Sequence, residues 1–131
     1  LTVFLEKGGV SDNSRCLLKW LYEVAKGMQY LEENKIMHGD LAARNVLLTH
    51  ERKAKIADFG LSTRIYIQTS ERKGARNGTF PFRWAAYEVI QSGATIKESS
   101  DVWSFGVLMW ELFHLGSAIP YGEYILGCGV N

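Results

Sequence analysis

Apolar residues follow a helical period over the segment that begins near Ser14 and ends near Asn34. They recur at steps of four, three, four and three positions, which places them on one face of an α-helix: Leu17, Leu21, Val24, Met28 and Leu31. We therefore predict a long amphipathic helix over this segment. The preceding stretch LTVFLEKGG predicts a shorter helix that ends at Gly8 and Gly9.

Two short apolar segments follow the long helix, VLLT at 46–49 and AKIA at 54–57, and both have the length of β-strands. The polar residues HERK lie between them and favour a turn, so we predict a β-hairpin. Farther along, residues 61–83 contain few apolar side chains and predict a long loop. Loops of this length in compact domains are usually functional or disordered.

Two more helices are predicted in the last third of the chain. The segment AAYEVIQSG, residues 85–93, predicts a short helix that ends at Gly93. The most apolar run extends from Val102 to Leu115; it is too short to cross a bilayer, and it contains Glu111. Because this run is apolar almost all round, we expect its helix to lie in the middle of the molecule.

The start of this apolar helix also has a predicted cap. Either Ser99 or Ser100 is expected to cap it, and Asp101 in the first turn suits the helix dipole. Trp103 and Trp110 are expected to be core residues.

Composition limits the classes of function. The chain has 131 residues, of which 47% are hydrophobic, and this predicts a single globular domain. A formal net charge of +1 argues against a nucleic-acid binder driven by bulk charge. The two cysteines, Cys16 and Cys128, lack the spacing of a metal site and favour a reducing compartment. The N-terminal stretch lacks the features of a signal peptide.

Polar residues gather in HGDLAARN, residues 38–45, between the long helix and the hairpin, and DFG follows the hairpin. If the hairpin returns Asp58 to Asp40 and Asn45, two carboxylates and one amide oxygen converge. Hard oxygen ligands of this kind suit Mg²⁺. Asp40 would then remain to accept a proton from a hydroxyl, a division of roles that fits phosphoryl transfer. An isolated Asp in a turn would more often simply face water.

The motifs in their order resemble the C-terminal lobe of a protein kinase: HGDLAARN, DFG, a loop, AYE and DVWSFG. The resemblance extends from residue 1 to about Tyr121. DLAARN is similar to tyrosine kinases, and so is FPFRW at residues 80–84. Arg44, four residues after Asp40, is the receptor-type arrangement. MHGDLAARNVLL most resembles invertebrate receptors of the vascular endothelial and platelet-derived growth factor type.

This resemblance implies an α+β protein kinase-like fold. Residues 1–131 would be a partial kinase domain, covering the mainly helical C-lobe from the helix D region through helix F and just beyond, with a short β-hairpin. The N-lobe and the last C-lobe helices would be missing. We therefore expect this chain alone to be inactive, poorly soluble and easily unfolded, since each large apolar side chain left in water forgoes roughly 1.5–3 kcal/mol.

The resemblance also implies the chemistry: ATP-dependent phosphorylation of protein tyrosine. Asp40 would be the catalytic base, and Arg44 would position the substrate hydroxyl. Asn45 and Asp58 would bind ATP through two Mg²⁺ ions, or Mn²⁺, and Leu47 would lie under the adenine. Pro81, Arg83 and Trp84 would form the platform for the substrate ring.

Further positions are implied to be structural or regulatory. His38 and Phe59 would pack in the core, with Gly60 completing DFG. Asp101 would accept hydrogen bonds from the backbone of residues 38–40. The remaining implied positions are Glu88, a structural ion-pair residue, and Tyr66, a possible phosphorylation site.

One departure from the family pattern is Gly39, where the usual residue is an Arg that binds a phosphorylated activation loop. Phosphorylation should therefore control this enzyme less. Implied partners are protein tyrosine substrates, SH2-type adaptors and a second receptor copy, with no nucleic acid. The implied location is the cytoplasmic side of the plasma membrane. The alternative is a non-catalytic fragment or pseudokinase that acts as a binding or decoy module.

Overall fold

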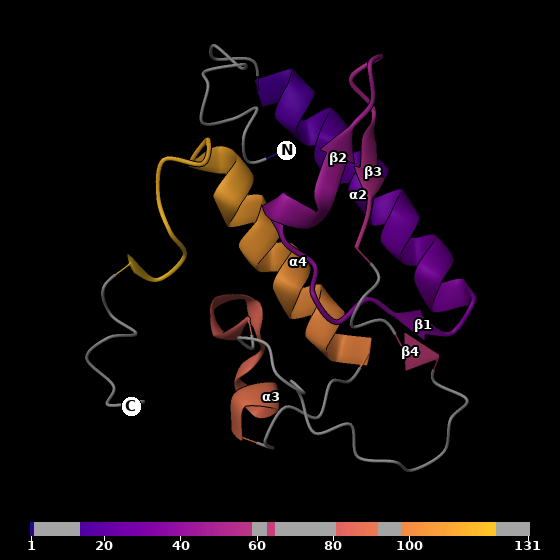
Figure 1. Cartoon of the computed structure of the whole chain (residues 1–131), viewed down its shortest axis with the longest axis vertical. Helices are drawn as coiled ribbons and strands as arrows, with labels where there is room; N and C mark the ends of the chain where they lie inside the picture. Colours follow the sequence, from indigo (N-terminus) through magenta and orange to yellow (C-terminus); the bar gives the residue numbers. More distant parts are fainter. Residues whose placement is uncertain (2–13, 59–62, 65–80, 92–97, 123–131) are drawn as a thin grey trace.

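The computed structural model describes residues 1, 14–58, 63–64, 81–91 and 98–122. Its elements in chain order are α2 (Ser14–Glu33), β1 (Ile36–Met37), η1 (Ala43–Asn45), β2 (Val46–Leu48), β3 (Ala54–Ile56), β4 (Thr63–Arg64), η2 (Phe82–Trp84), α3 (Tyr87–Gln91) and α4 (Glu98–Phe113), where η marks a 3₁₀ helix. The helices and the small antiparallel sheets (Figure 1) confirm the predicted α+β class. The short helix predicted before Gly8 and Gly9 lies outside the described residues.

Helix α2 confirms the prediction made from its apolar period. Its buried residues are Leu17, Trp20, Leu21, Val24 and Leu31, and Met28 packs against them half-buried. Trp20 is almost fully enclosed and donates its indole N–H to the carbonyl of Arg52 at 2.9 Å. The helix therefore packs through the face that the sequence periodicity marks.

The predicted hairpin is also confirmed. Strands β2 and β3 are antiparallel, with Val46 opposite Ile56. The turn is closed by two backbone hydrogen bonds: the N–H of Thr49 donates to the carbonyl of Lys53 at 2.9 Å, and the N–H of Arg52 donates to the carbonyl of Thr49 at 2.9 Å. The N–H of Ala54 also donates to a Glu23 carboxylate oxygen of α2 at 2.7 Å, which ties the hairpin to that helix.

A second pair of strands lies within the segment predicted as loop. β4 pairs antiparallel with β1, with Met37 opposite Thr63, and η2 forms near the end of the same segment. The prediction of loop over residues 61–83 is therefore wrong in these places. Strands of two residues are too short to have a readable period, and their pairing joins segments 26 residues apart.

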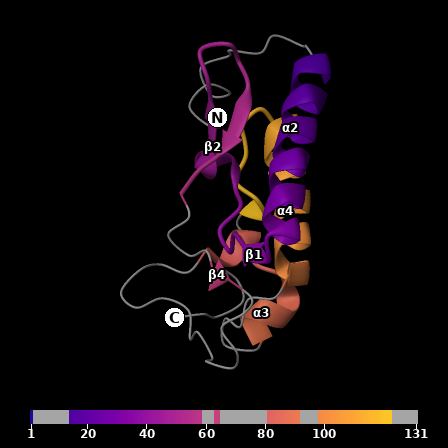
Figure 2. The ribbon, with the colours of Figure 1, turned by 90° about the vertical axis from the view of Figure 1, so that its right-hand side faces the viewer.

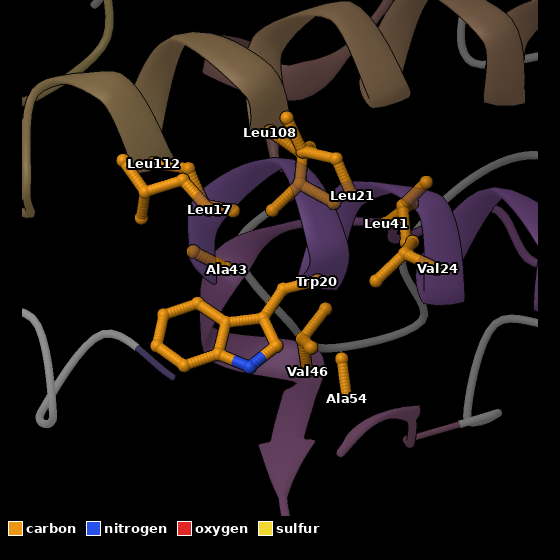
Figure 3. Packing of buried hydrophobic residues seen from close by; sticks show 10 residues of the cluster. All are labelled: Leu17, Trp20, Leu21, Val24, Leu41, Ala43, Val46, Ala54, Leu108 and Leu112. Carbon is orange, nitrogen blue, oxygen red and sulfur yellow. The ribbon is translucent and has the colours of Figure 1, made fainter. Parts of the chain in front are cut away.

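The core lies between α2, α4 and the loop that follows β1. Figure 2 shows α2 and α4 as one layer, with the β2–β3 hairpin on one side of it. In Figure 2 the segment between β1 and β2 lies on the same side of this layer as the hairpin. Figure 3 shows the residues that form the cluster: Leu17, Trp20, Leu21, Val24, Leu41, Ala43, Val46, Ala54, Leu108 and Leu112. The loop thus contributes its own side chains to the core.

Helix α4 is buried along one face only, so the expectation of burial all round is wrong for the described structure. Leu108 and Leu112 are fully enclosed, whereas Val102 is 74% exposed and Trp103 is 45% exposed. The assignment of Trp103 to the core is therefore also wrong, and Trp110 is half-buried. An apolar helix surface is buried only where other elements pack against it, and the described residues pack against one side.

The start of α4 differs from the prediction as well. The helix begins at Glu98, so Ser99 and Ser100 lie inside it and neither is its cap. The short helix predicted over residues 85–93 is present as α3, and Gly93 lies outside the described residues. Within the described ranges, no helix combines the length and the apolar character that a membrane crossing needs.

The C-terminus of α2 generates a stability prediction. Lys35 follows the helix with φ of 56°, a left-handed conformation that costs an L-residue roughly 1–2 kcal/mol. Replacing Lys35 with Gly should raise the free energy of unfolding by about 0.5–1 kcal/mol, because glycine adopts this φ without strain but loses more entropy on folding.

The matched control is the same substitution at Lys26, an exposed position inside α2. There Gly should lower the free energy of unfolding by about 1 kcal/mol, since glycine is a poor residue for a helix interior. Urea unfolding of both variants measures the effects. A loss of stability in Lys35→Gly as large as that in Lys26→Gly would contradict the assignment.

Candidate active site

In the segment from His38 to Asn45, a run of buried apolar residues lies between two charged residues that are partly exposed. Leu41, Ala42 and Ala43 are at most 1% exposed, and Leu41 and Ala43 belong to the same core cluster as the leucines of α4 (Figure 3). Asp40 and Arg44 flank this apolar stretch and are partly exposed. Burial of the apolar residues thus leaves these two charged side chains partly open to solvent.

The first half of this loop is bound to α4 by Asp101. The N–H of His38 donates to Asp101 Oδ2 at 2.8 Å, and the N–H of Gly39 donates to Oδ1 at 2.9 Å. This is the contact expected from the sequence, and it is confirmed. Asp101 is buried, so its charge is stabilised by backbone dipoles in a setting where such charge-assisted bonds are strong.

Gly39 occupies a left-handed backbone position, with φ of 79°. This conformation costs an L-residue roughly 1–2 kcal/mol, and glycine adopts it without that cost because it has no Cβ atom. The departure from the family pattern at this position therefore relieves backbone strain at the turn that Asp101 fixes.

Asp40 is oriented by two donors from the residues that follow it. Arg44 forms an ion pair with Oδ1 through Nη2, and Asn45 Nδ2 donates to Oδ2 at 2.9 Å. The same Asn45 nitrogen donates to the backbone carbonyl of Asp40 at 2.7 Å. Because both hydrogen bonds use the amide nitrogen, the amide oxygen of Asn45 is directed away from Asp40.

The hairpin returns the chain to this loop at Ala57. The N–H of Ala57 donates to the carbonyl of Asn45 at 2.8 Å, and its carbonyl lies 3.1 Å from His38 Nε2. The N–H of Asp40 donates to His38 Nδ1, so the ring proton lies on Nε2 and points to Ala57. His38 is fully buried, as expected of a core residue. Asp58 therefore directly follows Ala57, which is hydrogen-bonded to His38 at one end of the loop and to Asn45 at the other.

The polar groups at this point have the chemistry of a hard-cation site. Asp58 is exposed and left-handed, with φ of 59°, and Asn45 is mostly buried. A carboxylate and an amide oxygen fit Mg²⁺, which completes its shell with water and phosphate. Over the described ranges, no group of three or more His, Cys, Asp or Glu forms a metal cage.

Two of the three predicted platform residues lie beside Asp40. A small pocket is lined by Asp40, Pro81 and Trp84, among others, and the guanidinium carbon of Arg44 lies 4.2 Å from the centre of the Trp84 ring. Arg83 instead donates to the carbonyls of Pro120 and Gly122, at 2.7 and 2.8 Å.

The structure describes only some of the remaining predicted residues. Leu47 is 56% exposed on β2 despite its apolar side chain, and Glu88 is exposed on α3. Phe59, Gly60 and Tyr66 lie outside the described residues.

Glu111 also belongs to this region, although its position in the sequence did not predict it. Its Oε2 accepts the N–H of Ala43 at 2.9 Å and the indole N–H of Trp84 at 2.9 Å. The available signal was a charged residue inside an apolar helix, since a buried charge is tolerated only where hydrogen bonds satisfy it.

Comparison with known proteins gives a profile described as protein tyrosine and serine/threonine kinase, which matches residues 1–126. Tyrosine-protein kinase Shark of Drosophila melanogaster is 48% identical over 123 residues, covering 94% of this chain and 13% of that protein. Megakaryocyte-associated tyrosine-protein kinase of Mus musculus is 47% identical over 110 residues, covering 84% and 20%.

A relative named as a receptor is similar to the same degree. Tyrosine-protein kinase receptor torso of Drosophila melanogaster is 47% identical over 105 residues, covering 80% of this chain and 11% of that protein. The chain therefore spans a fifth or less of the length of these three relatives.

The contact between Asp101 and the loop generates a prediction. Asp101→Asn should lower the free energy of unfolding by about 1.5–3 kcal/mol, because asparagine offers one acceptor oxygen and turns an amide donor toward a second N–H. Urea unfolding and hydrogen exchange at the His38 and Gly39 amides measure the effect. Glu32→Gln, at an exposed position of α2, is the control and should change stability by less than about 0.5 kcal/mol. Unchanged exchange at both amides in Asp101→Asn would contradict the prediction.

Proposed function

The chain belongs to the family of protein tyrosine and serine/threonine kinases, and on that premise we propose that its parent protein phosphorylates tyrosine side chains of other proteins with ATP. The names of the three relatives described above support tyrosine as the acceptor. The observation that carries the proposal is the orientation of Asp40 by Arg44 and Asn45 at the edge of a pocket that includes Trp84.

Asp40 is proposed as the general base. One carboxylate oxygen is paired with Arg44 and the other with the Asn45 amide, and these two contacts orient the group at the pocket. A substrate hydroxyl that enters between Asp40 and Trp84 would give its proton to this carboxylate while its oxygen bonds to the γ-phosphorus of ATP, and the bond from that phosphorus to ADP would break. Such a base typically accelerates the reaction by about 10²–10⁴-fold.

Asn45 and Asp58 are proposed as the protein ligands of the metal ions. Protein kinases use ATP together with divalent cations. ATP supplies the phosphoryl group that is transferred, and the cations neutralise the charge of its phosphates. The choice of two Mg²⁺ ions, or Mn²⁺, is part of this proposal. The exposed side chain of Leu47 on β2 is proposed as the apolar contact for adenine.

Pro81 and Trp84 are proposed to support the substrate ring. Both border the pocket that contains Asp40, and the partly exposed indole of Trp84 offers an aromatic surface. Arg83 is proposed to act indirectly, because its hydrogen bonds to Pro120 and Gly122 link the platform segment to the chain after α4.

Five positions are proposed as structural or regulatory. His38 and Asp101 hold the loop backbone, Phe59 and Gly60 complete the segment after Asp58, and Glu88 is proposed to form an ion pair with an Arg beyond this chain. Tyr66 is proposed as a phosphorylation site whose effect is reduced by Gly39, which lacks the guanidinium that would bind a phosphate.

Residues 1–131 are proposed as a partial kinase domain of a receptor-type parent on the cytoplasmic side of the plasma membrane. Arg44, four residues after Asp40, supports the receptor type, and torso is a relative with receptor in its name. The resemblance to vascular endothelial and platelet-derived growth factor receptors rests on MHGDLAARNVLL alone. Receptor dimerisation and phosphotyrosine binding by SH2-type adaptors follow from this proposal.

The decisive variant is Asp40→Asn in the longer protein that contains this chain. Transfer of phosphate from ATP to a tyrosine peptide should fall by about 10²–10⁴-fold, because the amide cannot accept the proton. A radiometric assay with Mg²⁺ measures the rate, and Glu32→Gln should leave it unchanged. A rate in Asp40→Asn equal to that of the native protein would sink the assignment of Asp40 as base.

A further inference from the structure

We infer that Glu111 is a positioning residue that fixes Arg44 on the Trp84 ring and thereby orients Asp40. The inference rests on the function proposed above and adds a residue outside the catalytic loop to the site. Glu111 is 8% exposed, and its carboxylate contacts two segments that are 41 residues apart in the chain. One of these segments carries the proposed base and the other carries the proposed platform.

The first contact sets the backbone beneath Arg44. Glu111 Oε2 accepts the N–H of Ala43, the residue immediately before Arg44, in a buried hydrogen bond of 2.9 Å. Ala43 is 1% exposed and begins η1, so its position also determines where the Arg44 side chain leaves the loop.

The second contact sets the indole ring. The same Oε2 accepts the N–H of Trp84 at 2.9 Å, and the Ser104 hydroxyl donates to the Trp84 carbonyl at 2.8 Å. Backbone and ring of Trp84 are therefore both bound to α4. Because one oxygen receives both N–H groups, Glu111 fixes the distance between Ala43 and the indole.

Arg44 connects these two contacts to Asp40. Its guanidinium lies 4.2 Å from the centre of the Trp84 ring and is also paired with Asp40 Oδ1. A hydrogen bond from the indole N–H to a carboxylate increases the electron density of the ring, which strengthens its attraction for a cation. Glu111 therefore acts on Asp40 in two ways: it sets the position of Arg44, and it strengthens the attraction of the Arg44 guanidinium to the Trp84 ring.

The test compares Glu111→Met and Glu111→Gln in the longer protein. Methionine is similar in length but accepts neither N–H, so kcat for a tyrosine peptide should fall by roughly 10–10²-fold, the size of effect expected when a catalytic group is misplaced by about 1 Å. Glutamine can place its oxygen where Oε2 lies and should restore most of the rate. Leu112→Met, a volume-conserving change at the next residue of α4, is the control and should retain the native rate.

A double-mutant comparison separates positioning from general structural support. If Glu111 acts through Arg44, Glu111→Met should cause little further loss in a protein that already carries Arg44→Ala. If the fold loss of kcat in the double variant equals the product of the losses in Glu111→Met and Arg44→Ala, the inference is overturned. A native protein with no Asp40-dependent transfer would instead defeat the proposed function.

The inference also has a test that needs no activity. In Glu111→Met, solvent exchange of the Trp84 indole proton, followed by NMR and assigned with Trp84→Phe, should be faster than in the native protein. Glu111→Gln should restore slow exchange, and Leu112→Met should leave it slow. Slow exchange in Glu111→Met would overturn the inference.

Discussion

Two buried carboxylates on one helix fix the loop on which the candidate site depends. Asp101 receives the N–H groups of His38 and Gly39 at one end, and Glu111 receives that of Ala43 near the other. Moving a charge out of water is unfavourable unless hydrogen bonds replace its hydration, so each buried carboxylate needs the N–H donors of the loop. The N–H groups of the loop in turn need the carboxylate oxygens as acceptors. This mutual requirement gives the loop one position on α4.

Sequence predicted those parts of the fold that are encoded locally. The period of α2 and the turn between β2 and β3 depend on neighbouring residues, and both were placed within a residue or two. The pairing of β1 with β4 was not predicted, because each strand is two residues long. Trp103 was misplaced because apolar composition indicates a capacity for burial, whereas actual burial depends on which elements pack there.

The candidate site was predictable to a similar degree. Spacing and resemblance selected Asp40, Asn45 and Asp58 as candidates, and the hydrogen bonds at Ala57 bring the chain before Asp58 to the loop. Glu111 was missed because a motif describes residues close in sequence, whereas its partners lie 68 and 27 residues away. The backbone role of Gly39 was missed for a different reason, since φ is a property of the folded chain.

These features bear on how the orientation of Asp40 is maintained. In a kinase with Arg at position 39, a phosphate on the activation loop would supply an ionic link to the catalytic loop. Gly39 cannot make that link, and its amide is instead bound by Asp101 in a turn that glycine adopts without strain. The geometry of Asp40 then depends on contacts already present within the described residues, through α4 on one side and Arg44 on the other. Under the function proposed above, this preorganisation would let folding set the orientation of Asp40.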